Sequence, residues 1–110
     1  MKTGVFTGSF DPYTIGHDNI VRRMLTLFDR IVIGVVETNV HKQGQTPAEE
    51  RCANIARIYA QESKIEVKVY KDLAVDLAHR EHAQYIIKGI RSVKDFEYER
   101  EMAEIGRAHV

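Results

Sequence analysis

The chain of 110 residues has the length of one domain, and its 16 Lys and Arg balance its 16 Asp and Glu to a formal net charge of zero. This balance argues against broad electrostatic binding to nucleic acid or to an anionic membrane, but it leaves room for a local basic pocket. The one cysteine, Cys52, excludes an internal disulfide, and no stretch approaches the ~20 apolar residues that cross a bilayer. We therefore expect a cytoplasmic protein that binds neither nucleic acid nor membrane.

The first half of the chain alternates between apolar runs and segments of helical spacing. Residues 3–7 (TGVFT) predict a short buried strand, and residues 16–28 carry apolar side chains at the spacing of a helix. Arg30–Val36 (RIVIGVV) is a continuous, mostly β-branched run, which is typical of a strand covered on both faces. Residues 37–45 are polar and predict a loop.

The second half continues the alternation. Thr46 as N-cap, with Pro47 at the first helical position, predicts the start of a second helix. Ile65–Tyr70 (IEVKVY) alternates as a strand, and Asp72 is suited to cap a short third helix. Residues 85–88 (YIIK) predict a fourth strand.

A last helix is expected after the fourth strand, beginning at Ser92 or Asp95. One side of it is expected to carry Phe96, Glu99, Met102 and Ala103. The resulting order, β-α-β-α-β-α-β-α, predicts a Rossmann-like α/β fold, in which a parallel sheet has helices on both faces. Ligands of such sheets bind beyond the carboxyl ends of the strands, so the candidate site comprises the loops at residues 8–17, 37–45 and 89–95.

The most specific signal is the turn after the first strand, FTGSFDPYTIGH at residues 6–17. Gly16 lets a nucleotide approach the helix N-terminus, and His17 can donate a hydrogen bond to a phosphate there. The plainer alternative is that His17 only caps or packs and that Gly8 is an ordinary turn residue. The whole string resembles the nucleotidyltransferase superfamily, whose first strand ends in G-[ST]-F-D-P and whose first helix begins with [HT]-x-G-H.

A second motif narrows the resemblance. Residues 86–99 (IIKGIRSVKDFEYE) are similar to the [IV]-[RK]-G-[LI]-R-x-x-x-D-[FY]-E-Y-E segment of the bacterial phosphopantetheine adenylyltransferase family. Lys42 in the second loop and residues 46–51 (TPAEER) extend the similarity over residues 1–104.

That resemblance implies adenylyl transfer from ATP to 4′-phosphopantetheine, giving dephospho-coenzyme A and pyrophosphate in coenzyme A biosynthesis. The nucleophile is the acceptor's own phosphate, which is anionic at neutral pH, so the reaction needs positioning and cations rather than a general base. Mg²⁺ is expected with the ATP, although no carboxylate cluster in this chain forms an evident metal site. The family forms hexamers, so a homo-oligomer is expected.

The resemblance also assigns roles to individual residues. His17 is expected to stabilise the transferring phosphate, and Lys88 stands where many members have the two-pronged Arg. Residues expected to bind ATP are Ser9, Phe10, His17, Gly89, Ile90, Arg91 and Glu99. Residues expected to bind the acceptor are Ser9, Lys42, Ala74 and Lys88. Without the resemblance, a loop lysine such as Lys42 would be taken as merely solvated.

The sequence departs from the family pattern at its C-terminal end. The family continues with a fifth strand, an ISSTxxR phosphate signature and further helices, none of which occurs here. We expect an incomplete nucleotidyltransferase domain at residues 1–104, with the outer edge of the fourth strand unpaired. Residues 105–110 (IGRAHV) are expected to be a non-native tail, with a natural glycine cap and loose tail as the alternative.

Two other functions stay open at this point. One is an inactive fragment that at most binds phosphopantetheine or coenzyme A, because the second phosphate signature is missing. The other is a nucleotidyltransferase for a different phosphate acceptor, such as glycerol phosphate or nicotinamide mononucleotide.

Overall fold

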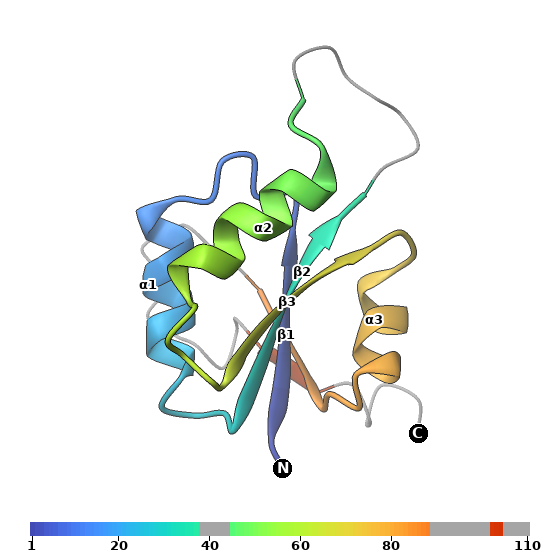
Figure 1. The fold of residues 1–110 in the computed structure, drawn as a ribbon. Helices are drawn as coiled ribbons and strands as arrows, with labels where there is room; N and C mark the ends of the chain where they lie inside the picture. The colour runs from blue at the N-terminus through green and yellow to red at the C-terminus, as the bar shows by residue number, and fades with distance from the viewer. Residues whose placement is uncertain (38–44, 89–101, 105–110) are drawn as a thin grey trace.

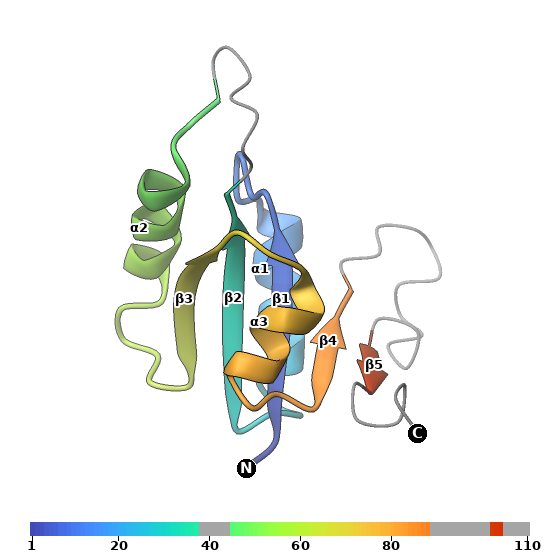
Figure 2. The same cartoon turned by 90° about the vertical axis from the view of Figure 1, so that its right-hand side faces the viewer.

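The computed structural model describes residues 1–37, 45–88 and 102–104. Its strands are β1 (Thr3–Gly8), β2 (Arg30–Val36), β3 (Ile65–Tyr70), β4 (Tyr85–Ile87) and β5 (Met102–Glu104), and its helices are α1 (Ile15–Met24), α2 (Ala48–Ile58) and α3 (Ala74–Arg80). The strands form one sheet in the order β3-β2-β1-β4-β5 (Figure 2). The first four strands are parallel, which confirms the predicted Rossmann-like α/β fold.

The helices cover both faces of the sheet. Helices α1 and α2 lie on one face and α3 lies on the other (Figure 1). Alternation along β1 divides the core between them: Phe6 belongs to the cluster under α1 and α2, whereas Val5 packs with Leu77 of α3. No helix among the residues described is long and apolar enough to span a membrane.

Helix α3 lies close to the sheet because β2 carries a glycine beneath it. A Cβ atom built on Gly34 would lie 2.5 Å from Leu77 Cδ2, so any side chain there would force the Leu77 side chain or the helix to shift. The register places Gly34 beside Thr7 of β1, one residue before that strand ends at Gly8. This contact therefore supports the sheet near the carboxyl edge, where ligands bind in such folds.

The predicted strands agree closely with the structure, whereas the helix starts and ends differ. Strands β2 and β3 have the predicted bounds, β1 extends to Gly8, and β4 ends at Ile87. Helix α1 ends at Met24 rather than near residue 28, because the Leu27 N–H donates three residues back to Met24 and tightens the chain into a turn.

Two predicted helix caps are wrong by one residue each. Pro47, not Thr46, is the N-cap of α2, and the Thr46 backbone N–H instead donates to a carboxylate across the site. Leu73, not Asp72, caps α3, because the Asp76 carboxylate accepts the Leu73 backbone N–H at 3.1 Å. Asp72 instead forms an ion pair with Arg80 at the other end of α3.

The expectation for the C-terminal part of the chain needs correction. Met102 and Ala103 lie in strand β5 and not on a helix, and β5 runs antiparallel to β4, with Ala103 opposite Ile86. The outer edge of β4 is therefore paired, whereas the sequence predicted an open edge. Exposed strand N–H and C=O groups need partners, and the nearby chain supplies them. The rest of the predicted last helix lies outside the described residues, as do residues 105–110.

Candidate functional site

The candidate site lies where β1 ends and the chain turns into α1. A cavity of about 350 Å³ opens there, and its lining includes Gly8, Ser9, Phe10 and His17. Three residues predicted to bind ATP (Ser9, Phe10 and His17) thus share one cavity at the carboxyl edge of the sheet. Because α1 starts beside this cavity, the backbone N–H groups of its first two residues, Ile15 and Gly16, have no acceptor inside the helix and point toward its N-terminal end, where an anion can bind.

His17 closes a reciprocal cap at the start of α1. Its backbone N–H donates to Thr14 Oγ1 at 3.3 Å, and its Nδ1 accepts from the Thr14 backbone N–H at 2.9 Å. The acceptor role of Nδ1 assigns the proton of the neutral imidazole to Nε2. The plainer alternative, that His17 caps the helix, is therefore correct as far as it goes, and the same cap leaves the ring with an N–H donor at Nε2.

Aromatic rings surround the imidazole and set its plane. The Phe10 ring meets the His17 ring edge-on, with centroids 5.0 Å apart and planes at 89°. The Tyr13 ring stacks on it at 5.3 Å and 28°, and Phe6 lies behind at 6.2 Å. Aromatic rings therefore pack against the His17 ring from more than one side, and this packing favours a single orientation of the imidazole.

Phe10 was predicted to bind ATP with Ser9 and His17, but its ring is buried in the core. Its side chain is only 4% exposed and belongs to the core, while its backbone has a φ of 49°. A Cβ on Gly8 would lie 3.1 Å from the Phe10 ring, so the glycine makes room for this tucked ring. Any contact of Phe10 with a nucleotide would therefore come from its backbone, not from ring stacking.

A buried arginine that sequence reasoning left without a role holds this turn in place. Arg51 of α2 is 5% exposed and donates through Nη1 to the Ser9 carbonyl at 2.5 Å and to the Val36 carbonyl at 3.4 Å. Its Nε donates to the Thr46 carbonyl at 2.8 Å. The only hint in the sequence was its place in the TPAEER string, which carried the resemblance but no function.

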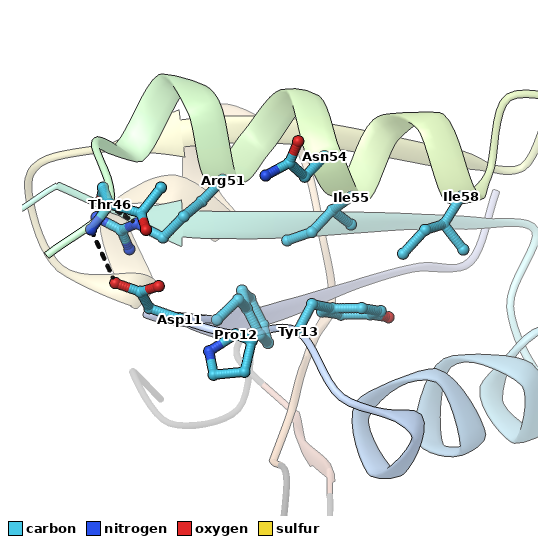
Figure 3. Close-up of a pocket in the computed structure, with 9 residues that line it drawn as sticks. Asp11, Pro12, Tyr13, Thr46, Arg51, Asn54, Ile55 and Ile58 are labelled. Atoms are coloured by element: carbon cyan, nitrogen blue, oxygen red, sulfur yellow. Dashed lines mark hydrogen bonds between the residues drawn. The ribbon is translucent and has the colours of Figure 1, made fainter.

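A second contact joins the same two segments. Asp11 Oδ2 accepts the Thr46 backbone N–H at 3.1 Å (Figure 3). Between the turn and α2 lies a cavity of about 270 Å³, with Asp11, Pro12 and Tyr13 facing Asn54 and Ile58 across it, as Figure 3 shows. The turn after β1 and the start of α2 therefore form one braced unit, although 35 residues separate Asp11 from Thr46.

The remaining predicted residues are distributed more widely. Lys88 is exposed directly after β4, and the pairing of Phe6 with Ile87 puts it beside the carboxyl end of β1. Ala74 begins α3 and is half-buried, on the opposite face of the sheet from α1. The other predicted residues lie outside the described part of the chain: Lys42, Gly89, Ile90, Arg91 and Glu99.

Within the described ranges, no group of three or more His, Cys, Asp or Glu side chains could hold a metal ion. Cys52 packs beside the main core cluster, and its burial raises the pKa of its thiol. Among the described residues, those around His17 offer the Ser9 hydroxyl, the imidazole N–H and the N-terminus of α1, and Lys88 follows the neighbouring strand end. Such a set suits the binding of phosphate groups.

Comparison with known proteins gives a consistent result. A family model described as "Cytidylyltransferase-like" matches residues 5–109. A Bacteroides fragilis protein named phosphopantetheine adenylyltransferase is 45% identical over 107 residues, which are 97% of this chain and 71% of that protein. A Phocaeicola vulgatus protein of the same name is 42% identical over 97% of this chain and 70% of its own length.

One solved structure supports the fold alone. The crystal structure of NadR protein in complex with NAD and AMP-PNP superimposes with a TM-score of 0.60 at 23% sequence identity. The match covers 74% of this chain and 26% of that one.

Proposed function

Since this chain belongs to the phosphopantetheine adenylyltransferase family, we propose that it transfers the adenylyl group of ATP to 4′-phosphopantetheine, giving dephospho-coenzyme A and pyrophosphate. The observation that supports this most strongly is 45% identity over 97% of the chain to the Bacteroides fragilis enzyme. The cavity at the end of β1, with a helix N-terminus and His17 beside it, provides a place for the phosphates. We place the reaction in coenzyme A biosynthesis, in the cytoplasm.

The reaction needs no base from the protein. A phosphate oxygen of 4′-phosphopantetheine attacks the α-phosphorus of ATP, a new P–O bond forms, and the bond from the α-phosphorus to the bridging oxygen breaks. Pyrophosphate leaves with that electron pair, and no proton has to be removed from the nucleophile. Most of the barrier is therefore met by bringing two anions together and stabilising the charge on the transferring group.

His17 is the residue that we propose acts on the transferring phosphate. The Thr14 cap keeps Nδ1 occupied as an acceptor, so Nε2–H is the donor toward an incoming oxygen. The exposed Ser9 lies in the same cavity and would meet the phosphates with its hydroxyl. The first N–H groups of α1 add the positive end of the helix dipole.

The acceptor would be held by positive charge at the neighbouring strand end. Lys88 follows β4 beside the end of β1, where its ammonium group can pair with the acceptor's phosphate. Lys42 is proposed for the same phosphate and Ala74 for the pantetheine arm. Backbone and side chains at residues 89–91, together with Glu99, are proposed to hold the nucleotide.

Two further expectations remain proposals. Mg²⁺ would arrive bound to the ATP triphosphate as part of the substrate and would neutralise charge on the β- and γ-phosphates. A homo-oligomer, hexameric as in the family, would be seen as a concentration-independent mass by light scattering.

A pyrophosphate-release assay tests the function. The chain is incubated with MgATP and, in parallel, with 4′-phosphopantetheine, glycerol 3-phosphate or nicotinamide mononucleotide. We expect release with 4′-phosphopantetheine alone. Release with another acceptor would replace the proposed substrate, and the absence of release with all three would contradict catalysis.

Calorimetry separates the last case from inactivity of the preparation. A chain that binds 4′-phosphopantetheine, does not bind ATP and releases no pyrophosphate would be a binding fragment. The chain spans 71% and 70% of the lengths of the two relatives described above. Because part of the binding site in those relatives can lie in the remainder, ATP and 4′-phosphopantetheine are titrated separately.

A further inference from the structure

A chain of three polar side chains runs from the ring stacked on His17 into the helix layer. The Tyr13 and Tyr59 hydroxyl oxygens are 2.5 Å apart, and the Tyr59 hydroxyl donates to Asp18 Oδ1 at 2.5 Å. These residues come from the turn before α1, the end of α2 and the first turn of α1. The contact between the hydroxyls joins residues that are 46 positions apart in the sequence.

The direction of this chain follows from counting protons. A tyrosine hydroxyl has one proton, and a carboxylate oxygen can only accept. Because Tyr59 gives its proton to Asp18, the bond between the hydroxyls must use the proton of Tyr13. The Tyr13 hydroxyl therefore donates to Tyr59, and the Tyr59 hydroxyl donates to Asp18.

The far end of the chain is firmly anchored. Tyr59 is 4% exposed and its ring meets that of Tyr13 edge-on at 6.1 Å. Asp18 also accepts from Arg22 Nε at 3.3 Å, and the Arg22 guanidinium lies 5.3 Å from the centre of the Tyr59 ring. Burial raises the pKa of Tyr13 to about 12 and also raises the pKa of Tyr59, so both hydroxyls stay protonated at neutral pH.

The near end of the chain reaches the site. The Tyr13 ring stacks on the His17 imidazole, so whatever fixes Tyr13 also restricts the plane of that ring, together with Phe10 and the Thr14 cap. We propose that Tyr13 and Tyr59 are positioning residues for His17, because their hydroxyl chain to Asp18 holds the stacked ring against the imidazole. This inference rests on the proposed role of His17 in phosphate transfer. The Thr14 cap sets which nitrogen donates, and the stack sets where that donor points.

Removal of single hydroxyl groups tests the proposal with little change in volume. Tyr59→Phe removes the acceptor of Tyr13, and Tyr13→Phe removes the donor while keeping an aromatic ring. Tyr70→Phe is the matched control, since Tyr70 is also buried but packs with α3 on the opposite face. Each variant of the 110-residue chain is first checked for cooperative unfolding.

The first measurement needs no catalysis. In ¹⁵N-edited NMR spectra, the His17 ring resonances should report a neutral Nε2–H tautomer and the ring-current effect of Tyr13. We expect these resonances to shift in Tyr59→Phe and Tyr13→Phe and to stay in place in Tyr70→Phe. Unchanged His17 resonances in both site variants would overturn the proposal.

The second measurement uses pyrophosphate release. We expect kcat to fall about threefold to tenfold in Tyr59→Phe, the effect of about one lost hydrogen bond, with KM for ATP within about twofold. In His17→Ala the further change Tyr59→Phe should have no effect. An equal loss in both backgrounds would mean that Tyr59 acts independently of His17, which contradicts the proposal. If the unaltered chain releases no pyrophosphate, the proposed function fails, while the NMR result still decides whether the tyrosines position the ring.

Discussion

The guanidinium of Arg51 donates a 2.5 Å hydrogen bond to the backbone carbonyl of Ser9, which lies 42 positions earlier in the chain. The same side chain also holds the carbonyls of Val36 and Thr46. These three hydrogen bonds are partly shielded from water, and a shielded carbonyl that loses its donor is not fully compensated by solvent. Arg51 is therefore the point at which the turn after β1, the end of β2 and the start of α2 are tied together.

We predict that Arg51→Met destabilises the protein by about 1–3 kcal/mol, because three part-buried carbonyls lose their donor. Arg51→Lys should recover only part of this loss, since an ammonium cannot span three carbonyls as a planar guanidinium does. Urea unfolding measures both effects. Arg57→Met on the exposed side of the same helix is the control and should change stability by less than about 0.5 kcal/mol. A loss in Arg51→Met no larger than in this control would contradict the bracing role.

The close approach of α3 to the sheet gives a second prediction. Gly34→Ala should cost about 1–3 kcal/mol, because the new methyl group would lie 2.5 Å from Leu77 Cδ2 in a packed core. Gly16→Ala is the informative contrast, since among the described residues the contact of a Cβ built there is with Thr14 Oγ1, at an ordinary 3.5 Å, and alanine is the better helix residue. It should leave stability unchanged or raise it by up to about 1 kcal/mol. Thermal unfolding compares the two, and equal effects would show that the contact with Leu77 has no energetic weight.

Acid sensitivity is expected from the ion pairs at the opposite edge of the sheet. Burial alone would raise the pKa of Glu81, but hydrogen bonds from Lys68 and Arg30 outweigh it and the pKa is lowered. A carboxyl whose pKa is lower in the folded state contributes stability above its unfolded value, near 4.5, and loses it as the pH falls further.

Glu81→Gln should therefore be less stable than the unaltered protein at pH 7, by about 1–3 kcal/mol. The difference should shrink as the pH falls below about 4.5, where the Glu81 carboxylate takes up its proton. Urea unfolding at several pH values measures this. Asp72→Asn, which alters an exposed surface pair with Arg80, should have little effect at any pH. A constant difference between Glu81→Gln and the unaltered protein across this range would mean that the carboxylate charge is not the source of the stability.

Lys88 provides a prediction about binding. Lys88→Ala should weaken binding of 4′-phosphopantetheine by about tenfold or more, since it removes one charge-assisted contact to phosphate. Lys88→Arg should retain binding, because the positive charge is kept and the guanidinium can donate two parallel hydrogen bonds to the phosphate. Calorimetry measures both, and Lys64→Ala, an exposed lysine before β3, is the control that should bind normally. Normal binding by Lys88→Ala would remove this lysine from the acceptor site.

Much of the fold was predictable because the residues within each strand show its pattern of apolar side chains. Arg30–Val36 and Ile65–Tyr70 were predicted with their observed bounds, since buried parallel strands need continuous or alternating apolar runs of just this kind. Helix caps were less predictable, because a polar residue near a helix start has competing partners in space. The Asp72 carboxylate pairs with Arg80 instead of capping α3, and this contact is not visible from the residues beside Asp72.

The C-terminal strand shows the same limit more strongly. Met102 and Ala103 have the spacing of a helix face, yet they pair with β4, whose edge would otherwise be open. The spacing of apolar residues in this segment does not show that β4, 15 or more residues earlier, has edge N–H and C=O groups that need partners. Tertiary pairing overrode helical spacing at this point.

The sequence by itself determined the family, the parallel α/β order and the cluster of Ser9, Phe10 and His17, because that motif is contiguous and its turn and helix start are set by neighbouring residues. Only the tertiary structure decided what surrounds it: Arg51 on the Ser9 carbonyl, and Tyr59 between Tyr13 and Asp18. Arg51 lies in α2 and Tyr59 directly follows it, and the placement of α2 depends on burial of an apolar face against the sheet. That is a long-range outcome of packing, so no short stretch of the chain contains it.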